Sequence, residues 1–210
     1  MELEQQESFE LHGPQLEVFG AVETKLPAPM KKRSTAGIFL AAMVLVAVFA
    51  VGGAKLRGQY SAVRASYTAQ DSYGQSITND LSLRADAAAN LVRMSGSILG
   101  ETDPTVQAAQ AALDAWNATS SDHPAEQYQA GTALGSTVDA MYNTVKGKAG
   151  DKLDALSTQY NEFLSRADIV QRETATGYNK DAESYNKKVQ GFPANVIGTI
   201  WGAGKVELYG

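Results

Sequence analysis

The chain contains no cysteine, only two histidines and no stretch of alternating apolar and polar residues long enough to predict a β-strand. Without cysteine it has no disulfide, no thiolate nucleophile and no cysteine-based metal site. The histidines, His12 and His123, lie far apart in the sequence, and neither has the acidic spacing of a helical zinc motif. The sequence therefore predicts a helical protein without a metal or other cofactor.

An excess of basic charge is also missing. The 156 residues that follow Ala54 carry 14 basic and 17 acidic side chains, which gives a net charge of −3. This balance provides no basic face for a phosphate backbone, so nucleic acid is not an expected partner. The same segment is long enough for one ordinary domain.

Long apolar runs are absent with one exception. Residues 34–54 are 21 consecutive uncharged residues. A bilayer core of roughly 30 Å needs about 20 apolar helical residues to cross it. The run therefore predicts a single transmembrane helix, with the lipid bilayer as a partner. Basic residues flank it on both sides: Lys31, Lys32 and Arg33 before it, and Lys55 and Arg57 after it.

A cleaved signal peptide is the alternative interpretation of this run. Gly52, Gly53 and Ala54 resemble a cleavage site, but a signal h-region has only about 7 to 15 residues and follows a short basic segment. Here 33 residues precede the run, which favours a retained anchor. Four basic residues on its N-terminal side against three on its C-terminal side predict an extracytoplasmic bundle.

The anchor divides the chain into three predicted parts. Residues 1–33 are expected to be a flexible acidic tail, because scattered glutamates, glycines and prolines bury too little apolar surface to offset the ordering entropy. Residues 34–54 are the transmembrane helix, which we expect to continue to about Ala69. Residues 55–210 are the expected helical bundle domain.

Helical periodicity recurs throughout residues 55–210. Apolar residues at intervals of three and four predict helices at about 77–98, 104–118, 125–146 and 151–190. The predicted fold class is all-α: a single N-terminal transmembrane helix followed by an antiparallel long-helix bundle. The residues expected to face inward in the last three helices are Val106, Ala109, Leu113 and Trp116; Tyr128, Leu134, Val138, Met141 and Val145; and Leu153, Leu156, Tyr160, Phe163, Ala167, Val170, Thr174, Tyr178, Ala182, Tyr185 and Val189.

Signals for helix ends and weak points accompany this pattern. Asp103 before Pro104 has the sequence of an N-cap followed by a first helical residue. Asp151 is the expected N-cap of the last helix. Gly131 and Gly135 each lower the stability of a helix by about 1 kcal/mol relative to alanine, so the helix predicted at 125–146 is the least stable of the four.

Candidate catalytic groups are few. Asp80 and Asp86 are the nearest approach to an acid–base pair, and we interpret them as solvated charges on a helix face. The glycines at 131 and 135 lack the Gly-Lys-Ser/Thr ending of a phosphate loop, and His123 is expected to be an exposed loop residue. We predict no catalytic, cofactor-binding or metal-binding residue, and the chain is not expected to be an enzyme.

Two tyrosines stand one heptad apart in the last helix, and each precedes an asparagine. Tyr178 and Tyr185 share a helix face on which a ring can be buried while its hydroxyl reaches a polar partner. We interpret them as residues of a core seam. Four apolar residues follow Phe192-Pro193: Val196, Ile197, Ile200 and Trp201. They can fold back on the bundle or insert into the lipid interface, and both placements stay open.

Two strings of sequence carry a family resemblance. The first holds Arg84, Asp86, Asn90, Leu91 and Val92, with alanines at positions 87–89. The second holds Tyr178, Asn179, Tyr185, Asn186, Val189, Gln190, Phe192, Pro193, Asn195 and Ile197. Behind one N-terminal anchor, they resemble the LemA family of bacterial membrane proteins. Its signatures are Arg-x-Asp-Leu-Ile-Pro-Asn-Leu-Val and Tyr-Asn, five residues, Tyr-Asn, Val/Ile-Gln-x-Phe-Pro-x-Asn-x-Ile.

This resemblance covers about Leu56 to Ile197 and implies a helical bundle without established enzymatic activity. The expected function is a membrane-anchored helical scaffold or protein-interaction protein, with an unidentified protein partner or a second copy of the chain. Two alternatives stay open. One is an accessory or enzyme domain that uses helix-face carboxylates such as Asp80 and Asp86, and the other is a sensor that signals through the anchor.

Overall fold

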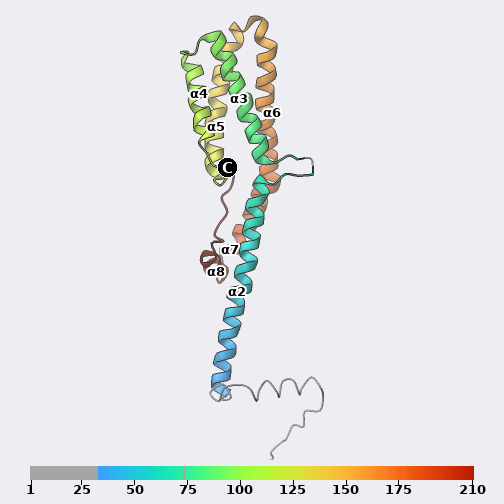
Figure 1. Ribbon diagram of the computed structural model, residues 1–210, viewed down its shortest axis with the longest axis vertical. Helices are drawn as coiled ribbons and strands as arrows, with labels where there is room; N and C mark the ends of the chain where they lie inside the picture. The colour runs from blue at the N-terminus through green and yellow to red at the C-terminus, as the bar shows by residue number, and fades with distance from the viewer. Residues whose placement is uncertain (1–32, 73) are drawn as a thin grey trace, which may run out of the picture. The chain divides into compact units, whose positions relative to one another are not determined.

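The computed structural model describes residues 33–72 and 74–210, so the flexible tail predicted for residues 1–33 lies almost wholly outside the described residues. Contacts divide the chain into two units, Met1–Gly52 and Gly53–Gly210. The structure is all-helical, and no strand occurs in the two described ranges, which confirms the predicted fold class. Figure 1 shows the helices in chain order.

The first described helix, α2, runs from Arg33 to Thr68 and contains the whole apolar run. Nine of its large hydrophobic side chains from Ile38 to Val51 are 44 to 71% exposed. By length and composition, α2 can cross a membrane. Its end at Thr68 confirms the prediction that the helix continues to about residue 69.

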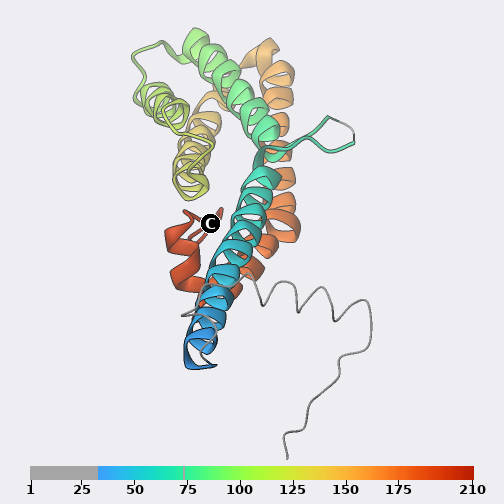
Figure 2. The same cartoon turned by 60° about the horizontal axis from the view of Figure 1, so that its bottom comes forward.

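The second unit is a bundle of helices connected by short loops. Its elements are α3 (Ile77–Leu99), α4 (Pro104–Asn117), α5 (Pro124–Val145), α6 (Leu153–Glu173), α7 (Asn179–Val189) and α8 (Ala194–Ile200). The closest packing is between α3 and α6 and between α4 and α5, and α3 also contacts α4 and α5. Figures 1 and 2 show each of these two pairs side by side.

The core follows the predicted helical stripes. On α4 all four residues predicted to face inward are buried, which confirms that stripe. On α5 the prediction holds from Leu134 to Val145, whereas Tyr128 is 42% exposed because its ring packs on the edge of the Tyr209 ring near the surface. On the last stripe Leu153 is 39% exposed, because it is the first residue of α6 and has no preceding turn to cover it.

One of the two predicted N-caps is confirmed. The Asp103 carboxylate accepts a 2.9 Å hydrogen bond from the backbone N–H of Thr105, and Pro104 is the first residue of α4. The prediction for Asp151 is wrong. A 3₁₀ turn, Gly150–Lys152, precedes α6, so Asp151 lies within that turn and caps no helix.

The longest helix is continuous but not uniform. A π-helical turn, Thr174–Tyr178, joins α6 to α7. Such a turn inserts an extra residue and changes which side chains face the core beyond it. Thr174, Tyr178, Ala182 and Tyr185 are all buried, so the apolar stripe stays in contact with the rest of the unit across this turn.

Candidate functional site

The two tyrosine–asparagine pairs of the last helix form hydrogen bonds with the C-terminal segment. Tyr178 and Tyr185 are each only 2% exposed, as predicted for a core seam. The Tyr178 hydroxyl donates a 2.6 Å hydrogen bond to the carbonyl of Glu207, and the Tyr185 hydroxyl donates one of 2.7 Å to the carbonyl of Ala203. Both tyrosines therefore hold backbone groups of residues 203–209. From here on we call this C-terminal segment the tail, as distinct from residues 1–33.

The asparagines hold the same tail with paired hydrogen bonds. The Asn186 side chain donates to the Val206 carbonyl and accepts from the Val206 N–H, both at 2.8 Å. The Asn179 side chain does the same with Tyr209, at 2.8 and 2.9 Å. Each amide thus satisfies both polar groups of one tail residue, as a neighbouring strand would do. We call the four residues at 178, 179, 185 and 186 the clamp.

The distance between the two clamp asparagines matches the length of the tail between their two partners. Two asparagines one heptad apart on an α-helix are separated by about 10.5 Å along its axis. Their partners, Val206 and Tyr209, are three residues apart, and three residues of extended chain span about 9 to 10 Å. Because both spacings agree, the tail fits in one register, running antiparallel to α7.

The tail also contributes apolar side chains. Ala203, Val206 and Tyr209 are buried, while the residues between them are exposed or half-buried. A period of three is typical of an extended chain of the polyproline II type and differs from the alternation of a β-strand. The clamp side chains therefore fix both the backbone and the buried face of the tail.

A second heptad pair of tyrosines, on α2, packs against the clamp. Tyr60 lies 6.0 Å from Tyr185, and Tyr67 lies 4.9 Å from Tyr178, measured between ring centroids. The Tyr67 hydroxyl donates a 2.7 Å hydrogen bond to the Gln127 side chain of α5. Residues 53–68 of α2, α7 and the tail are thereby joined by one aromatic cluster.

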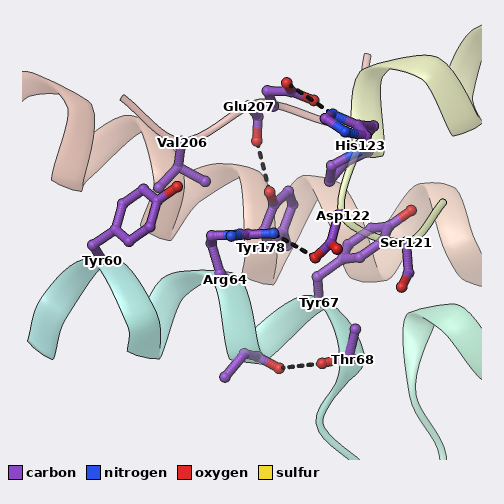
Figure 3. A pocket seen from close by; sticks show the side chains of 12 residues that line it. Tyr60, Arg64, Tyr67, Thr68, Ser121, Asp122, His123, Tyr178, Val206 and Glu207 are labelled. Carbon is purple, nitrogen blue, oxygen red and sulfur yellow. Dashed lines mark hydrogen bonds and ion pairs between the residues drawn. The ribbon is translucent and has the colours of Figure 1, made fainter. Parts of the chain in front are cut away.

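A surface pocket of about 500 Å³ opens beside this cluster, and Figure 3 shows its lining. Arg64 forms a 2.5 Å ion pair with Asp122 of the loop before α5, and the His123 ring lies 3.4 Å from the Glu207 carboxylate. All four side chains are substantially exposed, so each pair contributes little to stability. The prediction that His123 is an exposed loop residue is confirmed.

Burial keeps the clamp hydroxyls protonated. It raises the pKa of Tyr178 to about 12, with a smaller contribution from the Glu207 carboxylate. Burial likewise raises the pKa of Tyr185, and Tyr60 adds to the effect. Both hydroxyls are protonated at neutral pH and donate the hydrogen bonds that hold the tail.

The two aspartates that were the nearest approach to a catalytic pair do not form one. Asp86 is exposed, as predicted, but the prediction that Asp80 is solvated is wrong because it is 2% exposed. Arg166 of α6 donates a 2.6 Å hydrogen bond to Asp80 and another of 2.6 Å to Glu162. The guanidinium compensates the buried carboxylate, which gives Asp80 a role in holding α3 against α6.

The first family-like string has a structural placement as well. Leu91 and Val92 are buried between the helices, and the Asn90 side chain donates a 3.2 Å hydrogen bond to Gln159 of α6. Arg84 lies over the ring of Phe163, 4.5 Å from its centroid. Across residues 33–72 and 74–210, no group of three or more acidic, histidine or cysteine residues could hold a metal ion.

Sequence reasoning placed the tyrosines correctly but missed the partners of the asparagines. The tail lies about 20 to 30 residues beyond them in the chain, so no local pattern reveals the pairing. The signal that was available in the sequence is the repeat of Tyr-Asn itself, together with Ala203, Val206 and Tyr209 at intervals of three. Comparison of the chain with protein-family models, curated proteins and solved structures finds no match.

Proposed function

We propose that the protein is a single-pass membrane-anchored helical scaffold of the LemA type, whose bundle binds a protein partner. The observation that carries the proposal is the exposed apolar surface of α2. Nine large hydrophobic side chains between Ile38 and Val51 are at least 44% exposed, and lipid is the solvent in which such a surface is stable.

The clamp supports the LemA-type part of the proposal. The residues that match the family's second signature include all four clamp residues, and in this chain they do one structural task. These four residues hold the extended tail against the helix, which is a structural role. A motif with this role suits a scaffold, whose function depends on the shape that its surface keeps.

The C-terminal helix α8 adds a second apolar surface. In α8, Ile200 is 66% exposed and Ile197 is buried, so the helix folds back on the unit and also presents a hydrophobic side chain outward. Phe192, two residues before α8, is 86% exposed. The Arg57 guanidinium donates a 2.7 Å hydrogen bond to the Trp201 carbonyl, which fastens this end to α2 close after the apolar run. Exposed aromatic and aliphatic side chains at that position suit a lipid interface.

The anchor is tested by extracting membranes with alkaline carbonate. We expect the full-length chain to stay in the pellet. Release into the supernatant, or a mature N-terminus near Lys55, would contradict the anchor. The scaffold is tested by purifying the full chain in detergent from its own membranes, beside a screen of substrates. A stoichiometric protein partner supports it, and turnover of a substrate contradicts it.

A further inference from the structure

Arg84 is a half-buried cation that lies among three helices and forms no direct ion pair with a described residue. It projects from α3, and its Nε atom is fully enclosed with no hydrogen-bond acceptor. Neither a hydrogen bond nor an ion pair links Arg84 to any residue in the described part of the chain. The guanidinium lies over the face of the Phe163 ring, 4.5 Å from the ring centroid.

Two glycines of α5 create the space for this guanidinium. A Cβ atom at Gly131 would lie 3.3 Å from Arg84 Nη1, and a Cβ at Gly135 would lie 3.1 Å from Nη2. Alanine at either position would press on the cation, so the glycines that weaken α5 as a helix permit its close packing on Arg84. Both glycines of α5 therefore leave room for the half-buried Arg84 guanidinium.

A cavity of about 350 Å³ opens beside Arg84. Arg84 supplies the only charged side chain among the residues that line it. Hydroxyl and amide groups come from Tyr209, Thr132 and Gln171, and an apolar wall comes from α6 and the π turn. Burial lowers the pKa of the guanidinium, and the nearby Tyr209 and Asp139 side chains partly offset this effect.

We propose that this cavity binds a small oxyanion, a carboxylate or a phosphate, through the Arg84 guanidinium. The enclosed Nε–H of Arg84 has no hydrogen-bond acceptor, which is unfavourable, and a bound anion would supply one together with a counter-charge. The planar guanidinium matches the oxygen atoms of a carboxylate or a phosphate. The polar side chains around the opening supply further hydrogen bonds, and the apolar wall accommodates the body of an organic acid.

A tryptophan close to the site allows binding to be followed by fluorescence. The Trp116 ring lies 3.5 Å from the Cβ position of Gly131, beside the guanidinium. The chain has two tryptophans, so Trp201→Phe leaves Trp116 as the only one. The experiment titrates the full-length Trp201→Phe chain in detergent micelles with sodium benzoate in one arm and inorganic phosphate in the other, following fluorescence and the melting temperature.

We expect a saturable fluorescence change and a rise in melting temperature in at least one arm, and the responding arm identifies the oxyanion. Arg84→Gln should weaken that binding by at least about tenfold, because it removes the charge-assisted hydrogen bonds. Arg93→Gln, an exposed arginine on the same helix, should leave it unchanged. No saturable response in either arm, or equal affinity in Arg84→Gln, would overturn the proposal.

A second variant keeps the test decisive if Arg84→Gln does not fold. Gln171 is exposed at the rim of the cavity, so Gln171→Phe fills the opening without touching the core. We expect this variant to keep the wild-type melting temperature without ligand and to lose the response to the oxyanion. An unchanged response would place the bound anion elsewhere and contradict the site.

Discussion

Replacing Asn186 with alanine tests whether the clamp fixes the tail. The change removes both hydrogen bonds between the Asn186 side chain and the backbone of Val206. A typical hydrogen bond contributes about 1 kcal/mol net, so the tail should lose about 2 kcal/mol of local stability. That loss corresponds to a roughly 30-fold larger population of the open tail.

Trypsin measures this population directly. Lys205 is exposed in the middle of the tail, so cleavage after it releases residues 206–210 and is resolved by mass spectrometry. When opening and closing are fast relative to cleavage, the cleavage rate follows the population of the open form. In the full chain in micelles, Asn186→Ala should therefore be cut after Lys205 roughly 30 times faster than the wild type.

The control is Asn161→Ala. Asn161 lies exposed on α6, the same continuous helix, and no hydrogen bond to a described residue involves its side chain. Its cleavage rate should match the wild type. If Asn186→Ala were cut after Lys205 no faster than Asn161→Ala, the side-chain amide would not be what holds the tail.

Four further predictions follow from the seam, the ion pair and the anchor. Tyr185→Ala should lower the free energy of unfolding by about 3 to 5 kcal/mol in chemical denaturation, against less than about 0.5 for the exposed Lys187→Ala. The pKa of Tyr178 is raised from 10.0 to about 12, so its contribution to stability is complete below pH 10 and is lost as the pH rises to about 12; Tyr178→Phe should be less alkali-sensitive in that window. Arg166→Met leaves a buried carboxylate unpaired and should cost about 3 to 5 kcal/mol. Ser120→Cys should react with an impermeant thiol reagent in intact cells if the bundle is extracytoplasmic.

Each of these has a contradicting result. Equal unfolding curves for the two alanine variants would remove Tyr185 from the core. An identical alkaline melting profile for Tyr178→Phe would mean that its hydroxyl titrates as in water. A small effect of Arg166→Met would show that Asp80 is reached by solvent, and labelling of the cysteine only after lysis would reverse the orientation.

Local patterns were enough to predict the helices. The stripe on α4 and the Asp103 cap depend on residues close in sequence, and both are confirmed. Asp151 failed as a cap because its neighbour Gly150 adopts a positive φ of 52° within a 3₁₀ turn. Propensity alone does not distinguish such a turn from the first turn of an α-helix.

Long-range partners account for what the sequence could not predict. Asp80 has the surroundings of a surface residue until Arg166, 86 positions away, is placed beside it. Gly131 and Gly135 look like weak points of a helix until the Arg84 guanidinium is seen against them. In each case the deciding contact comes from another helix, which periodicity within one segment does not reveal.

The π turn left a trace that was readable in advance. The buried positions 170, 174, 178 and 182 advance by four residues three times in succession. Each step of four overshoots a full α-helical turn by about 40°, so a regular helix would rotate this stripe off the core. A locally wider turn absorbs the difference, and Thr174–Tyr178 is that turn.

The helix beyond this turn is sensitive to changes in length. The π turn already holds one extra residue, so a deletion within Thr174–Tyr178 would leave a regular α-helical turn. In the regular helix α7 each residue corresponds to about 100° of rotation, so deleting one residue between Asn179 and Tyr185 would swing Tyr185 away from the tail while Tyr178 kept its place. The loop at 118–123 has no such phase to keep. Insertions and deletions should therefore accumulate in that loop during evolution and be removed from α7, even where every individual side chain could be exchanged.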